Sequence, residues 1–198
     1  MAFDEKIFKE FCTEHYVPIM RPKTKDLLLT CIRTYKPKTI LEIGTAIGYS
    51  GSLILSNNSN CILTTIENDD VIAKIAQQNF KKCEVAERVV QLVGDAYYYI
   101  QELCNQNIKY DFIFLDGPKG QYIKYLPFLL NLLNKGGVMF TDNVFYRGMV
   151  LGKVETPKKK RTIVNNLRKF IFELNNNKDV QTQLYDIEDG IAVSVKLN

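Results

Sequence analysis

Between residues 39 and 141 the sequence alternates short apolar segments with longer segments of helical periodicity. The apolar segments span four to six residues and are apolar on both faces, which is typical of parallel strands covered by helices on both sides of a sheet. The predicted strands of this stretch are 39–43, 61–66, 89–93, 112–115 and 138–141. The alternation therefore predicts an α/β fold with a mostly parallel sheet.

Helices are predicted before, between and after these strands. Their ranges are 3–16, 23–35, 47–55, 71–82, 97–104, 122–133 and 162–175. Two prolines favour an extended link at 17–22, and Asn134-Lys135-Gly136-Gly137 is a typical stop for the helix at 122–133. The end of the chain differs, because 182–187 and 191–196 flank Glu188-Asp189-Gly190, a pattern that predicts a hairpin. We expect one α/β domain over residues 1–198.

Charge and hydropathy exclude some classes of protein. The 26 basic and 22 acidic side chains give a net charge of +4, which permits an anionic partner without requiring one. No apolar run approaches the roughly 18 residues that a membrane span needs. The first residues lack the basic flank and apolar block of a signal peptide. We therefore expect no membrane partner and a cytoplasmic location.

The five cysteines and the single histidine argue against zinc, thiol and serine-triad chemistry. No two cysteines have the spacing of a zinc knuckle or a redox motif, so we expect reduced, mostly buried thiols. His15 cannot form a site of paired histidines, and the sequence has no Gly-x-Ser-x-Gly elbow. The cysteines are Cys12, Cys31, Cys61, Cys83 and Cys104.

The first predicted strand runs into a glycine-containing turn. Residues 42–48 have the pattern Glu-x-Gly-x-x-x-Gly, and Ala46 stands where a dinucleotide-binding motif has glycine. Glycine lets the backbone approach a bulky ligand. Glu67 ends the second strand 19 residues after Gly48, where an acidic residue normally holds ribose hydroxyls. The glycine-containing turn and Glu67 together favour a site for an adenosine-type cofactor. The alternative is an ordinary glycine-rich turn and an unrelated solvent-exposed acid.

Two later strands end in carboxylates. Asp116 follows one, and Asp142 with Asn143 follows the next. Three oxygen ligands suit Mg²⁺ or Mn²⁺, although Asp and Asn also cap helices at such turns. Lys119 is a candidate general base, because a lysine near a cation in a closed pocket loses its proton readily. The alternative is a solvated surface lysine. Pro118 stiffens the loop, so the sequence leaves open whether the Lys119 side chain reaches the site.

Residues 40–50 resemble motif I of class I S-adenosylmethionine-dependent O-methyltransferases. Within that class the chain is most similar to the cation-dependent group of catechol and caffeoyl-CoA O-methyltransferases, from about residue 18 to the C-terminus. The resemblance implies a Rossmann-like, seven-stranded sheet whose last strand is antiparallel. It also implies that the helices within residues 1–36 cover the cofactor site, and it suggests a homodimer.

The resemblance assigns roles to individual residues. It implies that Asp116 and Lys119 are catalytic, and that Asp116, Asp142 and Asn143 hold the cation. The residues that it places around S-adenosylmethionine are Met20, Glu42, Gly44, Ser50, Glu67, Asp95, Ala96 and Asp116.

A finer resemblance concerns the substrate. Gly120-Gln121-Tyr122, and Asp142-Asn143-Val144 followed by an aromatic and Arg147-Gly148, are most similar to bacterial tRNA 5-hydroxyuridine methyltransferases. That similarity implies methylation of the wobble nucleoside of the tRNA anticodon loop. Two rival functions stay open: a catechol or hydroxycinnamoyl O-methyltransferase, and a cofactor-binding protein without turnover.

A basic segment gives some independent support for RNA, because cationic side chains there could contact phosphates. The candidate RNA-binding residues are Arg147, Lys158, Lys159, Lys160 and Arg161. Tyr122, Phe145 and Tyr146 could stack on an extruded base. The alternatives are a solvated basic face and aromatic residues in the core.

Overall fold

The computed structural model describes residues 3–15 and 19–198 of the chain. It comprises two compact units, Met1–Tyr99 and Ile100–Asn198. The strands form a seven-stranded sheet of order β3-β2-β1-β4-β5-β7-β6. This order confirms the predicted α/β, Rossmann-like fold. Within the described residues no helix is long and apolar enough to cross a membrane.

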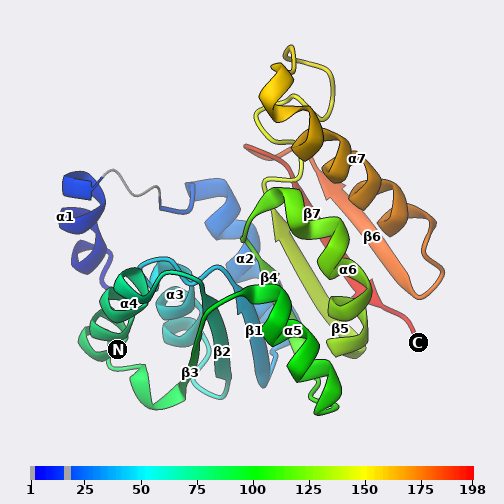
Figure 1. Cartoon of the computed structure of the whole chain (residues 1–198). Coiled ribbons are helices and arrows are strands. Elements are labelled where there is room, and N and C mark those ends of the chain that lie inside the picture. Colours follow the sequence, from blue (N-terminus) through cyan, green and yellow to red (C-terminus); the bar gives the residue numbers. More distant parts are fainter. Residues whose placement is uncertain (1–2, 16–18) are drawn as a thin grey trace. The chain divides into compact units, whose positions relative to one another are not determined.

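Unit 1 contains three parallel strands and the helices that connect them (Figure 1). Its elements are α1 (Lys6–His15), α2 (Pro22–Tyr35), β1 (Thr39–Ile43), α3 (Tyr49–Asn57), β2 (Ile62–Glu67), α4 (Asp70–Lys82), η1 (Ala86–Arg88) and β3 (Val89–Val93), and α5 (Ala96–Asn105) continues into unit 2. Pro22 does not lie in an extended link as predicted, because it begins α2, where its missing N–H costs no hydrogen bond. Residues 16–18 of the predicted link lie outside the described residues.

Strand β1 is almost entirely buried, whereas no residue of β3 is buried. The β1 residues from Ile40 onward are buried. By contrast, Val90 on β3 is 50% exposed, and Val93 is exposed as well. The prediction that every strand is covered on both faces is therefore wrong for β3. The physical reason is its position at the end of the strand order, where a neighbour lies on one side only.

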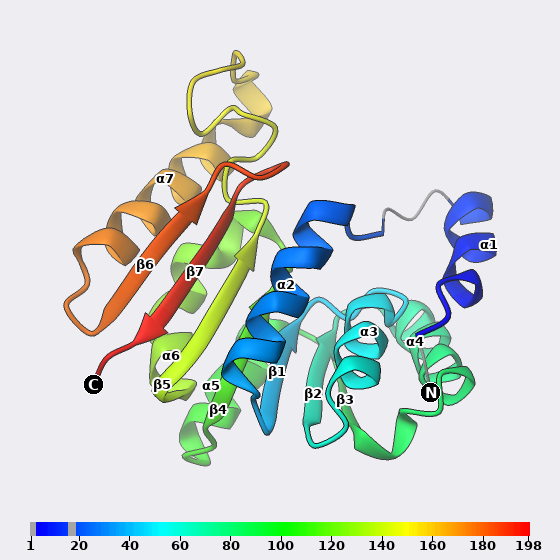
Figure 2. The ribbon, with the colours of Figure 1, turned by 180° about the vertical axis from the view of Figure 1, so that it is seen from behind.

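Unit 2 places a parallel pair beside an antiparallel hairpin. Its elements are β4 (Tyr110–Leu115), η2 (Lys119–Gln121), α6 (Tyr122–Leu132), β5 (Leu133–Asp142), η3 (Lys158–Lys160), α7 (Arg161–Asn176), β6 (Val180–Tyr185) and β7 (Ile191–Lys196). Opposite views show α6 and α7 on one face of β5, β7 and β6 (Figures 1 and 2). The predicted hairpin is confirmed, although β6 begins and ends two residues earlier than expected.

The expected helix stop at 134–137 lies inside β5. The strand already begins at Leu133, and the register with β4 shifts there, since Tyr110 pairs with Leu133 and Phe112 with Val138. Two lysines donate hydrogen bonds to the carbonyl oxygens at the end of α6. Lys196 Nζ donates to the carbonyl oxygens of Leu130 (2.7 Å) and Leu133 (2.8 Å). Cations at a helix C-terminus are stabilising because they face the negative end of its dipole.

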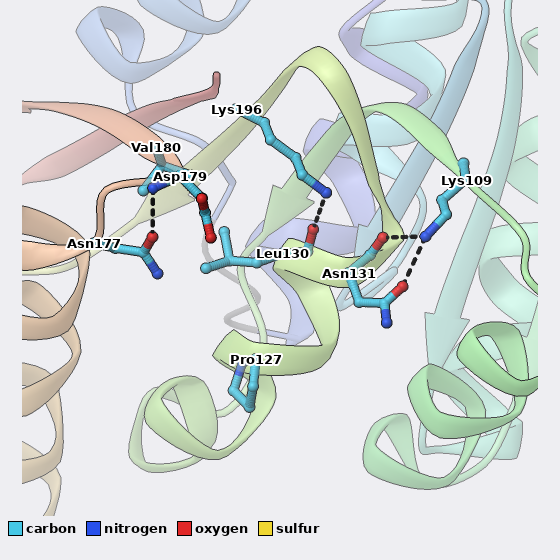
Figure 3. A pocket seen from close by; sticks show the side chains of 8 residues that line it. All are labelled: Lys109, Pro127, Leu130, Asn131, Asn177, Asp179, Val180 and Lys196. Atoms are coloured by element: carbon cyan, nitrogen blue, oxygen red, sulfur yellow. Dashed lines mark hydrogen bonds between the residues drawn. The ribbon is translucent and has the colours of Figure 1, made fainter. Parts of the chain in front are cut away.

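A second lysine lies at the same helix end. Lys109 Nζ donates to the backbone oxygen of Asn131 at 2.6 Å and to its side-chain oxygen at 2.7 Å (Figure 3). The two lysines border a pocket of about 420 Å³ with Pro127 and Asp179. Both ammonium groups already donate to backbone carbonyl oxygens at the end of α6. We therefore assign both lysines a structural role.

Candidate active site

The turn after β1 has a backbone that favours glycine. Gly44 and Gly48 have φ values of +101° and +81°. The Gly44 N–H donates to the Ile66 carbonyl at 3.0 Å, which ties the turn to β2. A Cβ on Gly48 would lie 3.0 Å from the Phe80 ring. The turn therefore needs glycine at 48 for its conformation and for the close approach of α4.

Glu42 is a fully buried carboxylate on β1. It accepts hydrogen bonds from the Ser50 hydroxyl and from the Thr65 hydroxyl, the latter at 2.6 Å. Hydroxyl donors stabilise a buried carboxylate. Glu42 thereby joins β1, β2 and the first turn of α3, so the structure brings together Glu42 and Ser50, two of the predicted cofactor-binding residues.

Glu67 lies directly beside the glycine turn. Its Oε2 accepts from the Ala46 N–H at 2.8 Å. Its Oε1 accepts from the N–H groups of Asn68 (2.9 Å) and Asp69 (3.0 Å). Glu67, which the sequence pattern assigns to a ribose, also fixes the turn at Ala46, whose φ is +45°.

The remaining predicted cofactor residues of unit 1 lie at two places. Asp95 follows β3, and its Oδ1 accepts from the Tyr98 N–H at 3.0 Å, which caps the start of α5 at Ala96. Met20 is half-buried against a cluster of apolar side chains that includes Phe8 and Tyr49. Asp95 and Met20 thus have a structural role of their own.

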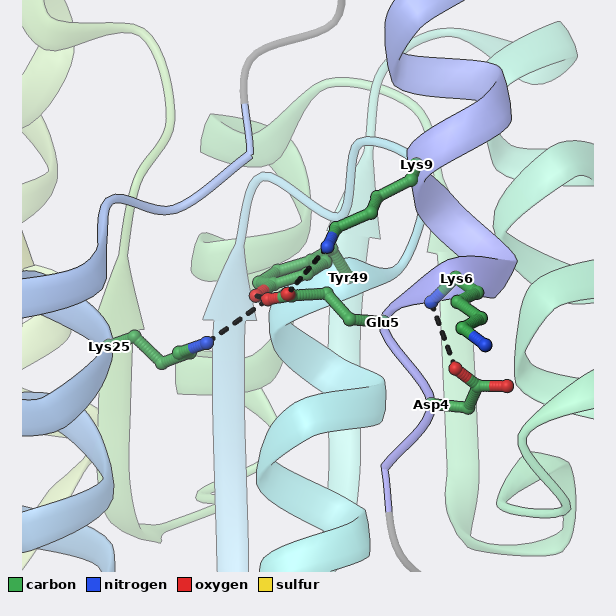
Figure 4. A network of polar contacts seen from close by, with 6 residues as sticks. All are labelled: Asp4, Glu5, Lys6, Lys9, Lys25 and Tyr49. Atoms are coloured by element: carbon green, nitrogen blue, oxygen red, sulfur yellow. Dashed lines mark hydrogen bonds and ion pairs between the residues drawn. The ribbon is translucent and has the colours of Figure 1, made fainter.

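A polar network at the start of α1 could not be foreseen from the sequence; its centre, Glu5, directly precedes the helix (Figure 4). Glu5 Oε1 accepts from the Tyr49 hydroxyl at 2.5 Å and from Lys25 Nζ at 3.0 Å. These donors lower the pKa of Glu5, while burial and the neighbouring carboxylate raise the pKa of Tyr49 and keep it protonated. The network links α1 to α2 and to the residue that follows Gly48.

In unit 2 the two predicted carboxylates lie side by side. Leu115 of β4 pairs in parallel with Thr141 of β5, so the next residues, Asp116 and Asp142, end neighbouring strands at the same level. Asp142 is only 6% exposed. Burial, followed by the charge of Asp116, raises the pKa of Asp142 to about 7. Burial also raises the pKa of Asp116, against the opposing effect of Lys119.

This arrangement fits a cation by the chemistry of its donors. The buried carboxylate of Asp142 and the half-buried carboxylate of Asp116 repel each other, and a hard cation bound by both would relieve that repulsion. Across residues 3–15 and 19–198 no group of three or more His, Cys, Asp or Glu side chains is placed to hold a metal. The candidate centre therefore comprises two carboxylates and the neighbouring amide residue Asn143.

Lys119 reaches the carboxylate pair. Pro118 precedes η2, and its carbonyl accepts from the Gln121 N–H at 2.8 Å, which starts a tight turn. From this turn Lys119 Nζ donates to Asp116 Oδ1 at 2.6 Å. The turn after Gly117-Pro118 thus places the Lys119 ammonium at the Asp116 carboxylate.

Tyr122 links the two strand ends that carry the carboxylates. Its hydroxyl lies 3.4 Å from the carbonyl oxygens of Leu115 and Asp142, to both of which it donates. Its ring is fully buried and packs on Phe170. Phe145 is buried too. The expectation that Tyr122 and Phe145 stack on a base is therefore wrong for the structure described, because both rings belong to the core.

The predicted RNA-binding residues differ in exposure. Arg147, Lys158, Lys159 and Arg161 are exposed, and Lys160 is half-buried. Lys160 Nζ lies 5.7 Å from the centre of the half-buried Tyr146 ring. Arg168, also in the basic segment, donates to the carbonyl oxygens of Val150 (3.0 Å) and Met149 (3.2 Å) and so holds the preceding loop.

A parallel sheet with an antiparallel C-terminal hairpin and a glycine turn followed by Glu67 define a Rossmann-like methyltransferase. The chain belongs to the O-methyltransferase family, whose model matches residues 5–197. This membership confirms the coarser part of the prediction, an S-adenosylmethionine-dependent O-methyltransferase of the caffeoyl-CoA and catechol type.

Individual proteins match over most of their length. A crystal structure from Staphylococcus aureus, provisionally assigned as a caffeoyl-CoA O-methyltransferase, is 33% identical with a TM-score of 0.86, over 96% of this chain and 91% of that one. The catechol O-methyltransferase of Niastella koreensis is 29% identical over 88% of this chain and 80% of its own. TomG of Streptomyces achromogenes, an O-methyltransferase crystallised with S-adenosylmethionine, is 25% identical with a TM-score of 0.82, over 100% of this chain and 92% of that one.

Proposed function

We propose that the chain transfers the methyl group of S-adenosylmethionine to a hydroxyl oxygen of a substrate that carries a second oxygen on the neighbouring carbon. The observation that carries this proposal is the carboxylate pair Asp116 and Asp142 with Lys119 Nζ 2.6 Å from Asp116. The oxygen ligands favour Mg²⁺ or Mn²⁺.

The residues of each unit have separate tasks. In unit 1, the glycine turn and Glu67 would bind the adenosine part, with Met20, Glu42, Ser50, Asp95 and Ala96 as further cofactor residues. In unit 2, Asp116, Asp142 and Asn143 would hold the cation. When bound, a divalent cation stabilises the anion of a hydroxyl group. Lys119, in its neutral amine form, would take the hydroxyl proton, and a base of this kind typically contributes about 10²–10⁴-fold to the rate.

We further propose 5-hydroxyuridine at the wobble position of tRNA as the substrate. Its O4 and O5 are neighbouring oxygens, as in a catechol, so the same cation site serves both. The exposed Arg147, Lys158, Lys159 and Arg161 supply positive charge for phosphates.

The alternative is a small-molecule catechol or hydroxycinnamoyl substrate. It is favoured by the names of the relatives, one a catechol O-methyltransferase and one provisionally a caffeoyl-CoA O-methyltransferase. The carboxylate pair with Lys119 argues against a protein without turnover, because such a protein has no use for it. A homodimer and a cytoplasmic location stay predictions.

A direct assay tests the proposal. The purified chain is given S-adenosylmethionine, Mg²⁺ and one of three acceptors: tRNA carrying 5-hydroxyuridine, the same tRNA with uridine, and a free catechol. We expect nucleoside mass spectrometry to find 5-methoxyuridine only in the first tRNA, because uridine lacks O5. Turnover of the catechol without turnover of hydroxyuridine tRNA would establish the alternative. Full activity in EDTA would contradict the cation.

A further inference from the structure

The turn between β6 and β7 contacts the loop that follows Asp142. The Val144 N–H donates to the Gly190 carbonyl at 3.0 Å, and the Phe145 N–H donates to the Asp189 carbonyl at 2.9 Å. The Arg147 N–H donates to Asp189 Oδ1. The β6–β7 turn thus accepts hydrogen bonds from three backbone N–H groups of the loop that carries Asn143.

That loop has an unfavourable backbone. Asn143, Tyr146 and Arg147 have φ values of +59°, +44° and +57°. Residues with a side chain rarely adopt this left-handed region, and it persists only where surrounding contacts impose it. The hydrogen bonds from the β6–β7 turn are such contacts.

The approach of the turn depends on Gly190. Its φ is +82°, and a Cβ there would lie 2.3 Å from the Phe145 ring. No larger residue fits without moving the ring. Gly190 thus brings Asp189 to within hydrogen-bond reach of the loop backbone.

We propose that Asp189 is a positioning residue for the candidate cation site. Its carboxylate and its backbone carbonyl hold the 143–147 backbone so that Asn143 stays beside Asp142, to whose Oδ1 the Asn143 N–H donates at 2.7 Å. Asp189 itself is not a ligand in this inference. The inference rests on the cation of the proposed function.

The chain offers a matched control three residues earlier. Asp186 lies in the same turn, and its carboxylate pairs with Lys153 Nζ at 2.9 Å. Both side chains are mostly exposed, and exposed pairs contribute little. Replacing Asp186 removes the same charge as replacing Asp189 without touching the backbone of 143–147.

The test is a titration of the full chain with Mn²⁺. Electron paramagnetic resonance measures the concentration of free Mn²⁺ and thus the binding affinity. Asp189→Ala should weaken binding about 10-fold, the lower end of the usual effect of residues that orient metal ligands. Asp189→Asn keeps an oxygen acceptor for the Arg147 N–H and should bind almost as the wild type does. Asp189→Glu keeps the charge but moves the carboxylate by one methylene, so it should also weaken Mn²⁺ binding. This variant replaces Asp189→Ala in the test if the alanine variant does not fold. Asp186→Asn should bind normally.

Each outcome decides one point. Equal weakening by Asp189→Asn and Asp186→Asn, with normal binding by Asp189→Glu, would show a charge effect and overturn the positioning role. Normal binding by all Asp189 variants would overturn it as well. If the wild type binds no Mn²⁺, the cation of the proposed function fails, and this inference fails with it. Amide exchange provides a second readout, because the Arg147 N–H should exchange faster in Asp189→Ala than in Asp189→Asn.

Discussion

Asp142 carries a free-energy cost in the folded chain, because its carboxylate is buried next to Asp116. A folded pKa of about 7, above the ordinary value of 3.8, means that the folded state holds this proton more tightly than the unfolded state does. In EDTA the stability should therefore fall as the pH rises from about 4 to 7. Asp142→Asn removes the charge and should stabilise the chain at pH 8, by roughly 1–4 kcal/mol, but not at pH 4.

Thermal unfolding in EDTA at pH 4 and pH 8 measures this difference, and the wild type at each pH is the control. The same variant should lose Mn²⁺ binding, because one of two carboxylate ligands is gone. A variant less stable than the wild type at pH 8 would show that the Asp142 carboxylate is better accommodated than its surroundings indicate.

Replacement of Glu67 tests the cofactor site. Glu67→Ala should weaken S-adenosylmethionine binding by roughly 1.5–3 kcal/mol, the range for hydrogen bonds to a charged group. It also removes the acceptor of the Ala46 N–H and so loosens the turn. Calorimetry measures the affinity, and Asp70→Ala is the control because Asp70 is an exposed acid paired with Lys74. Unchanged affinity would remove Glu67 from the cofactor site.

Residues at or just after the end of a strand were predictable, and residues that act across the chain were not. Glu67, Asp116 and Asp142 could be placed because the end of a strand is visible in the sequence. Glu5 bonds to a partner 44 positions away, and Asp189 to one 42 positions away. An acid in a first helix or in a turn looks solvated, and only the folded backbone brings its donor near.

Helix α1 is held in unit 1 by aromatic contacts and by Glu5. Phe3 and Phe8 contact the Tyr49 ring at centroid distances of 5.3 Å. Tyr49→Phe keeps these contacts and removes the hydroxyl, so it should weaken the docking of α1 by about 1.5–3 kcal/mol, the range for a hydrogen bond to a charged group. Amide exchange in α1 at pH 7 measures this. Lys9→Ala is the control, because the distance from Lys9 Nζ to Glu5 is longer, 3.6 Å, and the Lys9 side chain is mostly exposed.

The pH dependence of this docking has a definite sign. The pKa of Glu5 is lowered from 4.5 in the folded state, so its contribution is complete above about pH 4.5 and is lost as the pH falls through the lower, folded pKa. The exchange difference between Tyr49→Phe and the wild type should therefore shrink at acid pH. A difference that persists unchanged there would assign the effect to packing.

Element boundaries were predictable where the signal is local. The bounds of β1, β3 and β7 are those predicted from the sequence. The start of β5 was missed, because Gly136 is typical of a helix stop yet lies inside a strand. Lys196 binds the carbonyl oxygens at the end of α6, and its bond to the Leu130 carbonyl spans 66 positions, which no local pattern reveals.

At the scale of the whole molecule, the family follows from the fold and the glycine turn, whereas the substrate depends on the surface. Double replacement of the exposed Lys158 and Lys159 by alanine should weaken tRNA binding and reduce the slope of log affinity against log salt, by about 0.7–0.9 for each phosphate that is no longer neutralised. Replacing Lys81 and Lys82, which are exposed on α4, removes the same charge elsewhere and is the control.

Catechol methylation should respond little, because a small chelating substrate needs the cation, Lys119 and the cofactor. Filter binding at several salt concentrations, with both substrates assayed, separates these effects. If both double variants change tRNA binding alike, the basic segment acts only through net charge, and the small-molecule function gains support.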